Sequence, residues 1–143
     1  MTGLYHVCFA VPELERAMAD MTASVGMGWR EIRRDRVGEW DFRIVFSAGD
    51  PPYVELIEAG PGSPWDPSAG PHFHHLGFWT TSITAGSGRL ERQGFPVDFS
   101  GCPYGRSFAY HRVDSIGARI ELVDAARQPD FLDGLPMPAI PED

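Results

Sequence analysis

Lysine is absent from this chain of 143 residues, and all 12 of its basic side chains are arginines. They are outnumbered by 20 acidic side chains, which gives a formal net charge of -8 at pH 7. A chain this acidic, without a cluster of basic residues, lacks the positive surface that binds nucleic acids or anionic membranes. We therefore expect a small molecule as its partner, and neither nucleic acid nor membrane.

Cysteine is also scarce, since Cys8 and Cys102 are the only two in the chain. Two cysteines are too few for a disulfide framework in a domain of this size. No apolar run approaches the ~20 residues needed to cross a bilayer, and the first residues lack the basic start and apolar stretch of a signal peptide. Apolar residues make up 43% and charged residues 22%, as in globular proteins. We expect one globular domain in the cytoplasm.

An internal repeat is the most informative feature of the sequence. Residues 5–14 read Tyr-His-Val-Cys-Phe-Ala-Val-Pro-Glu-Leu, and residues 74–83 read His-His-Leu-Gly-Phe-Trp-Thr-Thr-Ser-Ile. In each segment a histidine, His6 or His75, precedes a short apolar run typical of a buried strand. Each half closes with a second matching run, Val-Glu-Leu-Ile-Glu-Ala at 54–59 or Ile-Glu-Leu-Val-Asp-Ala at 120–125. Because both matches come in the same order, we interpret the chain as two copies of one module.

Each copy is predicted to contain a strand, a helix and three further strands. The helices are expected at 13–22 and 83–93, where apolar side chains recur at helical spacing and a glycine follows. The later strands are expected at 29–32, 41–46 and 54–57 in the first copy, and at 97–99, 107–112 and 119–123 in the second. The predicted single domain, residues 1–143, thus has module one at 4–59, a Gly- and Pro-rich linker at 60–71, module two at 72–126 and an irregular tail at 127–143.

The repeated glutamates Glu55 and Glu121 each stand between two apolar residues of a predicted strand. An ionised carboxylate in such a place costs several kcal/mol unless something pairs with it. A divalent metal ion at the pseudo-twofold axis, bound also by His6 and His75, would compensate both charges. Two imidazoles and two carboxylates suit zinc, iron, nickel, cobalt or manganese better than calcium or magnesium. The alternative is a fold of this kind that binds a ligand without a metal.

These motifs resemble those of the vicinal oxygen chelate superfamily, which contains glyoxalase I, methylmalonyl-CoA epimerase, extradiol dioxygenases and bleomycin resistance proteins. The resemblance covers about residues 4–125 and rests on Tyr-His-Val-Cys-Phe-Ala-Val-Pro-Glu-Leu-Glu at 5–15, Val-Glu-Leu-Ile-Glu at 54–58, His-His-Leu-Gly-Phe at 74–78 and Ile-Glu-Leu-Val at 120–123. It is nearest to the epimerase-like and glyoxalase I-like members. It implies an α+β fold of two tandem βαβββ modules, whose curved mixed sheets enclose a central cavity.

The resemblance also implies site residues and a reaction. The metal ligands would be His6, Glu55, His75 and Glu121, with His75 preferred to its neighbour because it aligns with His6. Members of the superfamily use the metal to stabilise an enolate, so we expect a lyase, isomerase or epimerase that removes a proton beside the carbonyl of a small acyl or oxo substrate. Glu121 would act as ligand and base, and Glu39 resembles in placement the second base of the epimerases.

Two other functions stay open at this point. An extradiol-type dioxygenase would hold iron with two histidines and one glutamate, and Tyr110 and His111 would serve as acid and base beside it. A protein related to bleomycin resistance would sequester a drug or metabolite without catalysis, by stacking aromatic side chains on it. In each case we expect the substrate pocket to include Phe46, Trp79, Tyr110 and His111. A homodimer is also open, because many members of the superfamily pair modules between two chains.

Overall fold

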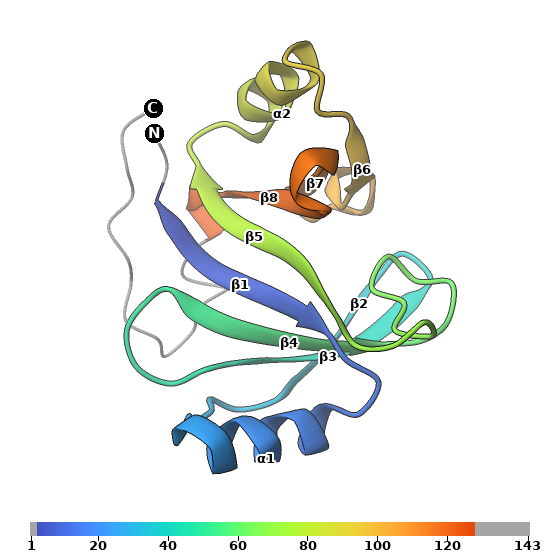
Figure 1. The fold of residues 1–143 in the computed structure, drawn as a ribbon. Coiled ribbons are helices and arrows are strands. Elements are labelled where there is room, and N and C mark those ends of the chain that lie inside the picture. Colours follow the sequence, from blue (N-terminus) through green and yellow to red (C-terminus); the bar gives the residue numbers. More distant parts are fainter. Residues whose placement is uncertain (1–2, 128–143) are drawn as a thin grey trace.

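One mixed sheet of eight strands dominates the computed structural model, which describes residues 3–127, and two α-helices lie against the outside of this sheet (Figure 1). In chain order the strands and α-helices are β1 (Leu4–Ala10), α1 (Leu14–Val25), β2 (Arg33–Val37), β3 (Trp40–Phe46), β4 (Tyr53–Ala59), β5 (His72–Thr80), α2 (Ile83–Arg92), β6 (Val97–Ser100), β7 (Phe108–Val113) and β8 (Ala118–Asp124). The predicted irregular tail lies outside the described residues, apart from Arg127 at its start.

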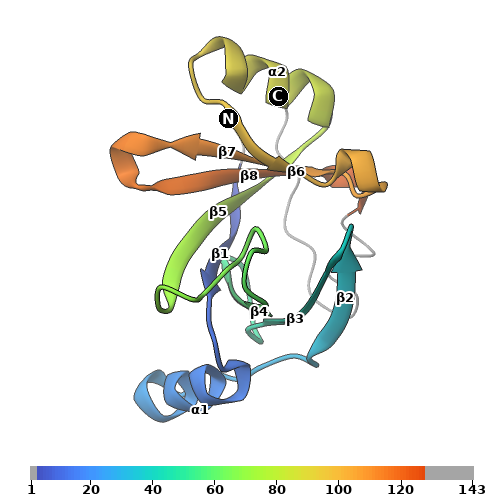
Figure 2. The same cartoon turned by 90° about the vertical axis from the view of Figure 1, so that its right-hand side faces the viewer.

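The sheet repeats the same arrangement on the two sides of its centre. Its strand order is β2-β3-β4-β1-β5-β8-β7-β6. The central strands β1 and β5 run antiparallel, and each has a parallel partner, β4 or β8, on its other side. Figure 2 shows that the sheet is strongly curled, so that its two halves face each other across a concave side. The prediction of an α+β fold with two tandem βαβββ modules is confirmed.

Both helices form where the apolar spacing predicted them, and each covers the outer face of its own half. On α1, Leu14 is completely buried and packs with Val45 and Leu56 of the sheet. This helix ends at Gly26, whose φ of 68° is the left-handed conformation that glycine adopts without strain. The other helix, α2, is preceded by the N-cap residue Ser82, whose hydroxyl accepts a hydrogen bond from the backbone N–H of Ala85.

The strand predicted at 29–32 is wrong, because β2 begins only at Arg33. Residues 29–32 contribute no more than one isolated bridge, between Trp29 and Ser47. The true strand reads Arg-Arg-Asp-Arg-Val and lies at the edge of the sheet, where only Val37 is buried. Polar side chains suit an exposed edge strand, and for that reason the strand has no apolar pattern to reveal it.

The linker at residues 60–71 is part of the core. Its Trp65 is 1% exposed and packs against Phe42 of β3, Phe99 of β6 and Tyr110 of β7. The indole N–H of Trp65 donates a hydrogen bond of 2.8 Å to the Tyr110 hydroxyl. In Figure 2 the green segment between β4 and β5 accordingly lies between the two halves of the curled sheet. The linker therefore joins the halves by contact as well as by covalent connection.

Among the described residues, neither α-helix has the length and apolar character needed to span a lipid bilayer.

Candidate metal centre

The strand register brings the four repeated residues to the middle of the concave face. Within β1, His6 lies opposite Gly77 of β5, and Gly77 in turn lies opposite Glu121 of β8. One row further along, Glu55 of β4 lies opposite Cys8 of β1, and Cys8 lies opposite His75 of β5. Residues opposite one another in a sheet point to the same face. The two rows therefore place all four candidate ligands on one face, at the junction of the modules.

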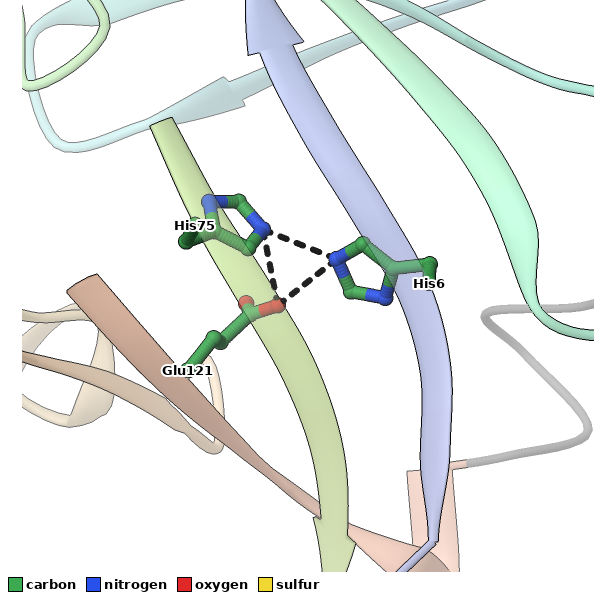
Figure 3. Close-up of side chains that lie close together, drawn as sticks. All are labelled: His6, His75 and Glu121. Atoms are coloured by element: carbon green, nitrogen blue, oxygen red, sulfur yellow. Dashed lines mark hydrogen bonds and ion pairs between the residues drawn. The ribbon is translucent and has the colours of Figure 1, made fainter. Parts of the chain in front are cut away.

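Three of these side chains point at one another from three different strands (Figure 3). The Nε2 atoms of His6 and His75 are 2.8 Å apart. The Oε1 atom of Glu121 lies 3.1 Å from Nε2 of His6 and 3.2 Å from Nε2 of His75. Ligand atoms of this set all lie within 4.8 Å of one another, as one shared metal ion requires.

The fourth predicted ligand, Glu55, faces the same two nitrogens from the other half of the sheet. Its Oε1 atom lies 3.6 Å from Nε2 of His6 and 3.5 Å from Nε2 of His75. Cys8, Glu55 and His75 form a second cluster of ligand atoms within 4.8 Å, so the Cys8 thiol also adjoins the centre. Burial and the nearby Glu55 raise the pKa of this thiol well above its ordinary value.

The electrostatics show how the buried charges of this cluster stabilise one another without a metal. Both histidines and both glutamates are at most 3% exposed. Burial opposes charge on His75, yet the carboxylate of Glu121 prevails and raises the pKa of this imidazole to about 9. Burial likewise opposes charge on Glu121, but the positive ring of His75 lowers the pKa of the carboxyl to about 2. Without a metal, the centre is therefore held by a buried imidazolium between carboxylates.

The residues present fit a divalent cation. Two imidazole nitrogens that face each other at 2.8 Å need a proton or a cation between them, because two lone pairs repel. The Oε1 atom of Glu121 is buried and completes no hydrogen bond, although both nitrogens lie close to it. Two imidazoles with two carboxylates are a donor set for zinc or another first-row transition metal. His6, Glu55, His75 and Glu121 would hold the ion.

Gly77 makes room for one of these ligands. A Cβ atom added at Gly77 would lie 2.1 Å from Cε1 and 2.3 Å from Nδ1 of His6. No real Cβ atom approaches a ring so closely, so any other residue here would displace the imidazole. The repeat-equivalent residue in module one is Cys8, which lies beside His75. The two modules thus differ at the position next to each histidine.

A cavity of about 280 Å³ opens from the metal centre toward the edge of the sheet. Glu55 and Glu121 lie at its inner end, where both are buried. Its walls are mostly apolar and aromatic, and they come from both modules and from the linker: Val37, Phe42, Ile44, Phe46, Ile57, Trp65, Phe108 and Tyr110. Arg33, Arg34, Asp35 and Arg106 line its outer end. An ion pair between Asp35 and Arg106 bridges the two modules there.

The structure brings some of the predicted pocket residues to this cavity and places others elsewhere. Phe46 and Tyr110 line it. Trp79 is buried on the same face but stacks on Tyr5, with 4.1 Å between the ring centroids, and does not reach the cavity. His111 follows Tyr110 on β7 and so points to the opposite face, where it contacts Ser87 and the carbonyl of Phe95. The placement of Trp79 and His111 in the pocket is therefore corrected.

Glu39 also lies away from the centre. It is exposed in the two-residue turn between β2 and β3 and is not among the residues that line the cavity. The position beside a strand suggested a base from sequence, but the turn directs this side chain to solvent. The two carboxylates at the inner end of the cavity are Glu55 and Glu121.

Trp65 and the arginines of the outer end were missed by sequence reasoning. The expectation that the chain lacks a basic cluster overlooked the run Arg-Arg-Asp-Arg at 33–36, in which neighbouring arginines indicate a surface for a small anion. Arg33 and Arg106 are far apart in the chain, so the sequence did not show that they line the same cavity. For Trp65 no signal existed, since a tryptophan in a linker rich in glycine and proline resembles an exposed loop residue.

The family-model match identifies the same superfamily that the sequence motifs resemble. A family model described as the Glyoxalase/Bleomycin resistance protein/Dioxygenase superfamily matches residues 5–113. No curated protein matches the sequence. Among solved structures, methylmalonyl-CoA epimerase from Mycobacterium tuberculosis is 20% identical, with a TM-score of 0.64, over 85% of this chain and 87% of that one.

Two further solved structures have the same fold. A variant of methylmalonyl-CoA epimerase from Streptomyces coelicolor, in complex with 2-nitronate-propionyl-CoA, is 17% identical, with a TM-score of 0.65, over 88% of this chain and 99% of that one. A mutant of 4-hydroxymandelate synthase from Streptomyces coelicolor is 18% identical, with a TM-score of 0.60, over 86% of this chain and 48% of that one. At such identities the likeness shows the fold alone.

Proposed function

The chain belongs to the Glyoxalase/Bleomycin resistance protein/Dioxygenase superfamily, and we propose that it is a metal-dependent isomerase, epimerase or lyase. In this proposal it transfers a proton next to the carbonyl of a small oxo or acyl substrate. One observation carries the proposal. Two carboxylates and two imidazoles converge on one point, and both carboxylates face the inner end of an apolar cavity.

The residues divide the work between binding and proton transfer. His6 and His75 do not line the cavity and would serve as ligands only, whereas Glu121 lines it and could also act on a substrate. A bound divalent cation supplies stabilisation of the negative charge that develops on the substrate oxygen. Glu121 would accept the proton from the α-carbon as the C–H electron pair moves toward the carbonyl oxygen. In an isomerase the same carboxyl group would then return the proton to the neighbouring carbon, whereas an epimerase would need a second acid that protonates the α-carbon from the opposite face.

The cavity walls favour a substrate with an apolar body and an anionic end. Aromatic and aliphatic side chains cover the inner part, and they exclude water from the carboxylates. Three arginines against one aspartate line the outer part, which favours a carboxylate or phosphate there. Methylmalonyl-CoA, the ligand of one structural neighbour, is an anionic acyl thioester and belongs among the compounds to be tested.

A dioxygenase is the second candidate, because one specific observation favours it. His6, His75 and Glu121 form one of the two clusters of potential metal ligands among the described residues, and two histidines with one carboxylate are the iron-binding set of many oxygenases. Glu55, at 3.5 to 3.6 Å from both imidazoles, adds a fourth donor that would occupy a position such enzymes keep open. The four-donor arrangement therefore favours proton transfer over oxygen chemistry.

Hydrogen exchange at carbon tests the proposal. The purified protein is first analysed for bound metals together with His75→Ala, which should lose about one equivalent of metal. It is then loaded with zinc, nickel, cobalt, manganese or ferrous iron and mixed in deuterated water with 2-oxo acids and acyl thioesters. We expect deuterium at the α-carbon of at least one substrate, and a loss of more than about 100-fold in Glu121→Gln, because a general base contributes about 10²–10⁴.

The controls separate the competing assignments. Glu91→Gln changes an exposed carboxyl on α2 and should leave the exchange rate unchanged. Loss of exchange in Glu39→Gln would instead restore the base that the sequence suggested. Oxygen uptake with catechols by the iron form would support the dioxygenase. Tight binding of a metabolite without exchange or oxygen uptake would contradict both reactions and identify a sequestering protein.

A further inference from the structure

A second histidine lies directly behind one of the metal ligands. His74 precedes His75 on β5, is completely buried, and brings its Nδ1 atom to 2.8 Å from Nδ1 of His75. Its other ring nitrogen, Nε2, lies 2.8 Å from the backbone carbonyl oxygen of Pro64 in the linker. We propose that His74 is a positioning residue, which holds His75 in the tautomer whose Nε2 lone pair faces the metal. The inference rests on the proposed metal centre.

The carbonyl of Pro64 decides where His74 carries its proton. A carbonyl oxygen only accepts hydrogen bonds, so the Nε2 atom of His74 must be the donor. In a neutral imidazole the other nitrogen is then an acceptor. The ring of His74 is completely buried, which favours its neutral form. The Nδ1 atom of His74 therefore offers a lone pair to His75.

The tautomer of His75 follows from that of His74. The two Nδ1 atoms are in hydrogen-bond contact, and since His74 accepts, His75 must donate from its Nδ1. When the ring loses its second proton, the Nε2 atom of His75 has a lone pair that a metal ion would accept. That atom is the one that faces Nε2 of His6 and Oε1 of Glu121. A hydrogen bond to the far nitrogen of a ligating histidine fixes the ring and raises its basicity.

His6, the proposed histidine ligand in module one, has no histidine equivalent to His74 beside it. The Nδ1 atom of His6 is buried and has no hydrogen-bond partner among residues 3–127. In the repeat, Tyr5 occupies the place of His74, and its ring meets His6 edge-on without a hydrogen bond to it. Within the described part of the chain, only module two therefore has a series of hydrogen bonds from the linker carbonyl through His74 to the ligand. His74 thus acts in one half of an otherwise repeated site.

Zinc affinity and the ring proton of His75 test the inference together. The dissociation constant for Zn²⁺ is measured by competition with a chromophoric chelator in the wild type, His74→Phe, His74→Gln and His72→Phe. His74→Phe keeps the ring volume but removes both hydrogen bonds, and we expect zinc to bind about 10- to 100-fold more weakly. The amide of His74→Gln can donate to Pro64 and accept from His75, so it should recover most of the affinity. His72 is an exposed histidine on the same strand, and His72→Phe should bind zinc like the wild type.

The proton is read by long-range ¹H–¹⁵N NMR of the zinc-loaded protein. We expect a downfield Nδ1–H signal from His75 that is protected from exchange in the wild type and in His74→Gln, with the signal of His6 as the internal comparison. Should His74→Phe fail to fold, the spectra of the wild type and of His74→Gln still show whether His75 carries its proton on Nδ1. Equal zinc affinity in folded His74→Phe, or an His75 ring bound to zinc through Nδ1, would overturn the inference. Because no substrate is used, a wild type that binds zinc but exchanges no proton would contradict the proposed function and not this assignment.

Discussion

At the scale of single residues, the departure from twofold symmetry is as informative as the symmetry itself. The repeat gives each module one histidine and one glutamate, yet it places Gly77 beside one histidine and Cys8 beside the other. A histidine beside glycine has space for its ring, and a histidine beside cysteine has a further donor atom next to it. The two imidazoles are therefore not equivalent ligands.

The role of Gly77 is tested by Gly77→Ala. The added methyl group would overlap the ring of His6, so we expect zinc to bind at least about 10-fold more weakly. Overpacking at this point should also lower the free energy of unfolding by about 1–3 kcal/mol. Both quantities are measured by chelator competition and by chemical denaturation. Gly60→Ala is the matched control, because nothing lies within 4 Å of a Cβ atom there; an equal effect in both variants would contradict the assignment.

The repeat was sufficient to predict which four side chains converge, because a duplicated pattern marks equivalent positions in two modules. His6, Glu55, His75 and Glu121 were predicted in this way, and the structure places them around one point. The pocket was harder to predict, since its lining depends on which strand faces lie opposite one another in space. Sequence alternation assigns His111 to a face but does not say whether that face borders a cavity or a helix.

At the scale of elements, the linker between the modules does more than connect them. Its Trp65 lies between strands of both halves and closes one wall of the cavity. The next residue toward the N-terminus, Pro64, provides the carbonyl that binds His74. One short segment therefore contacts both the substrate cavity and a residue behind the metal centre.

Substitution of Trp65 measures what this contact contributes. Trp65→Ala removes a buried indole, so we expect the free energy of unfolding to fall by about 3–5 kcal/mol. Trp65→Phe keeps an aromatic ring but loses the hydrogen bond to Tyr110, and should cost only about 1 kcal/mol beyond the change in packing. Chemical denaturation gives both values. A cost below about 0.5 kcal/mol in Trp65→Ala, as for an ordinary surface position, would show that the linker is only a connection.

The buried strands could be predicted from the sequence, whereas the exposed edge strand β2 could not. Strands with apolar runs were found because they are buried in the middle of the sheet, and the superfamily resemblance that rested on them is confirmed by the match over residues 5–113. The edge strand β2 was missed because its arginines and aspartate face solvent and the cavity mouth. Such a strand is defined by its pairing with β3 and not by its composition.

At the scale of the whole molecule, the charge of the centre makes stability depend on pH when no metal is bound. The pKa of His75 is raised from 6.5 to about 9, so the stabilising contribution of its positive charge is complete below pH 6.5 and is lost as pH rises toward 9. The pKa of Glu121 is lowered from 4.5 to about 2, so its contribution is complete above pH 4.5 and is lost as pH falls toward 2. Both pKa shifts arise from the same charge interaction, between His75 and Glu121.

We therefore expect the free energy of unfolding of the metal-free protein to be highest between pH 4.5 and 6.5. Above this range it should decline by up to about 1.4 kcal/mol per pH unit, because the folded state holds one proton more than the unfolded chain. Denaturation with a chelator present, from pH 4 to 9, gives the profile. Zinc replaces the proton, so zinc-loaded protein should lose the alkaline decline, and so should Glu121→Gln. A flat profile in the metal-free wild type would contradict the expected charge state.

Two further expectations concern the whole molecule. Homodimer formation and a cytoplasmic location stay predictions from the sequence.

The pairing of β1 with β5 at the centre of the sheet also has a consequence for the order of events during synthesis. Each module carries two of the four donors, and the two histidines, 69 positions apart in the chain, meet only when the modules pair. If the centre binds a metal as proposed, a nascent chain that has released only module one would offer His6 and Glu55, which together would be a weak site. High affinity would arise only after Glu121 on β8, the last strand along the described part of the chain, has joined them. Metal acquisition would then follow the completion of folding, and an unfinished chain would compete poorly for the ions of its surroundings.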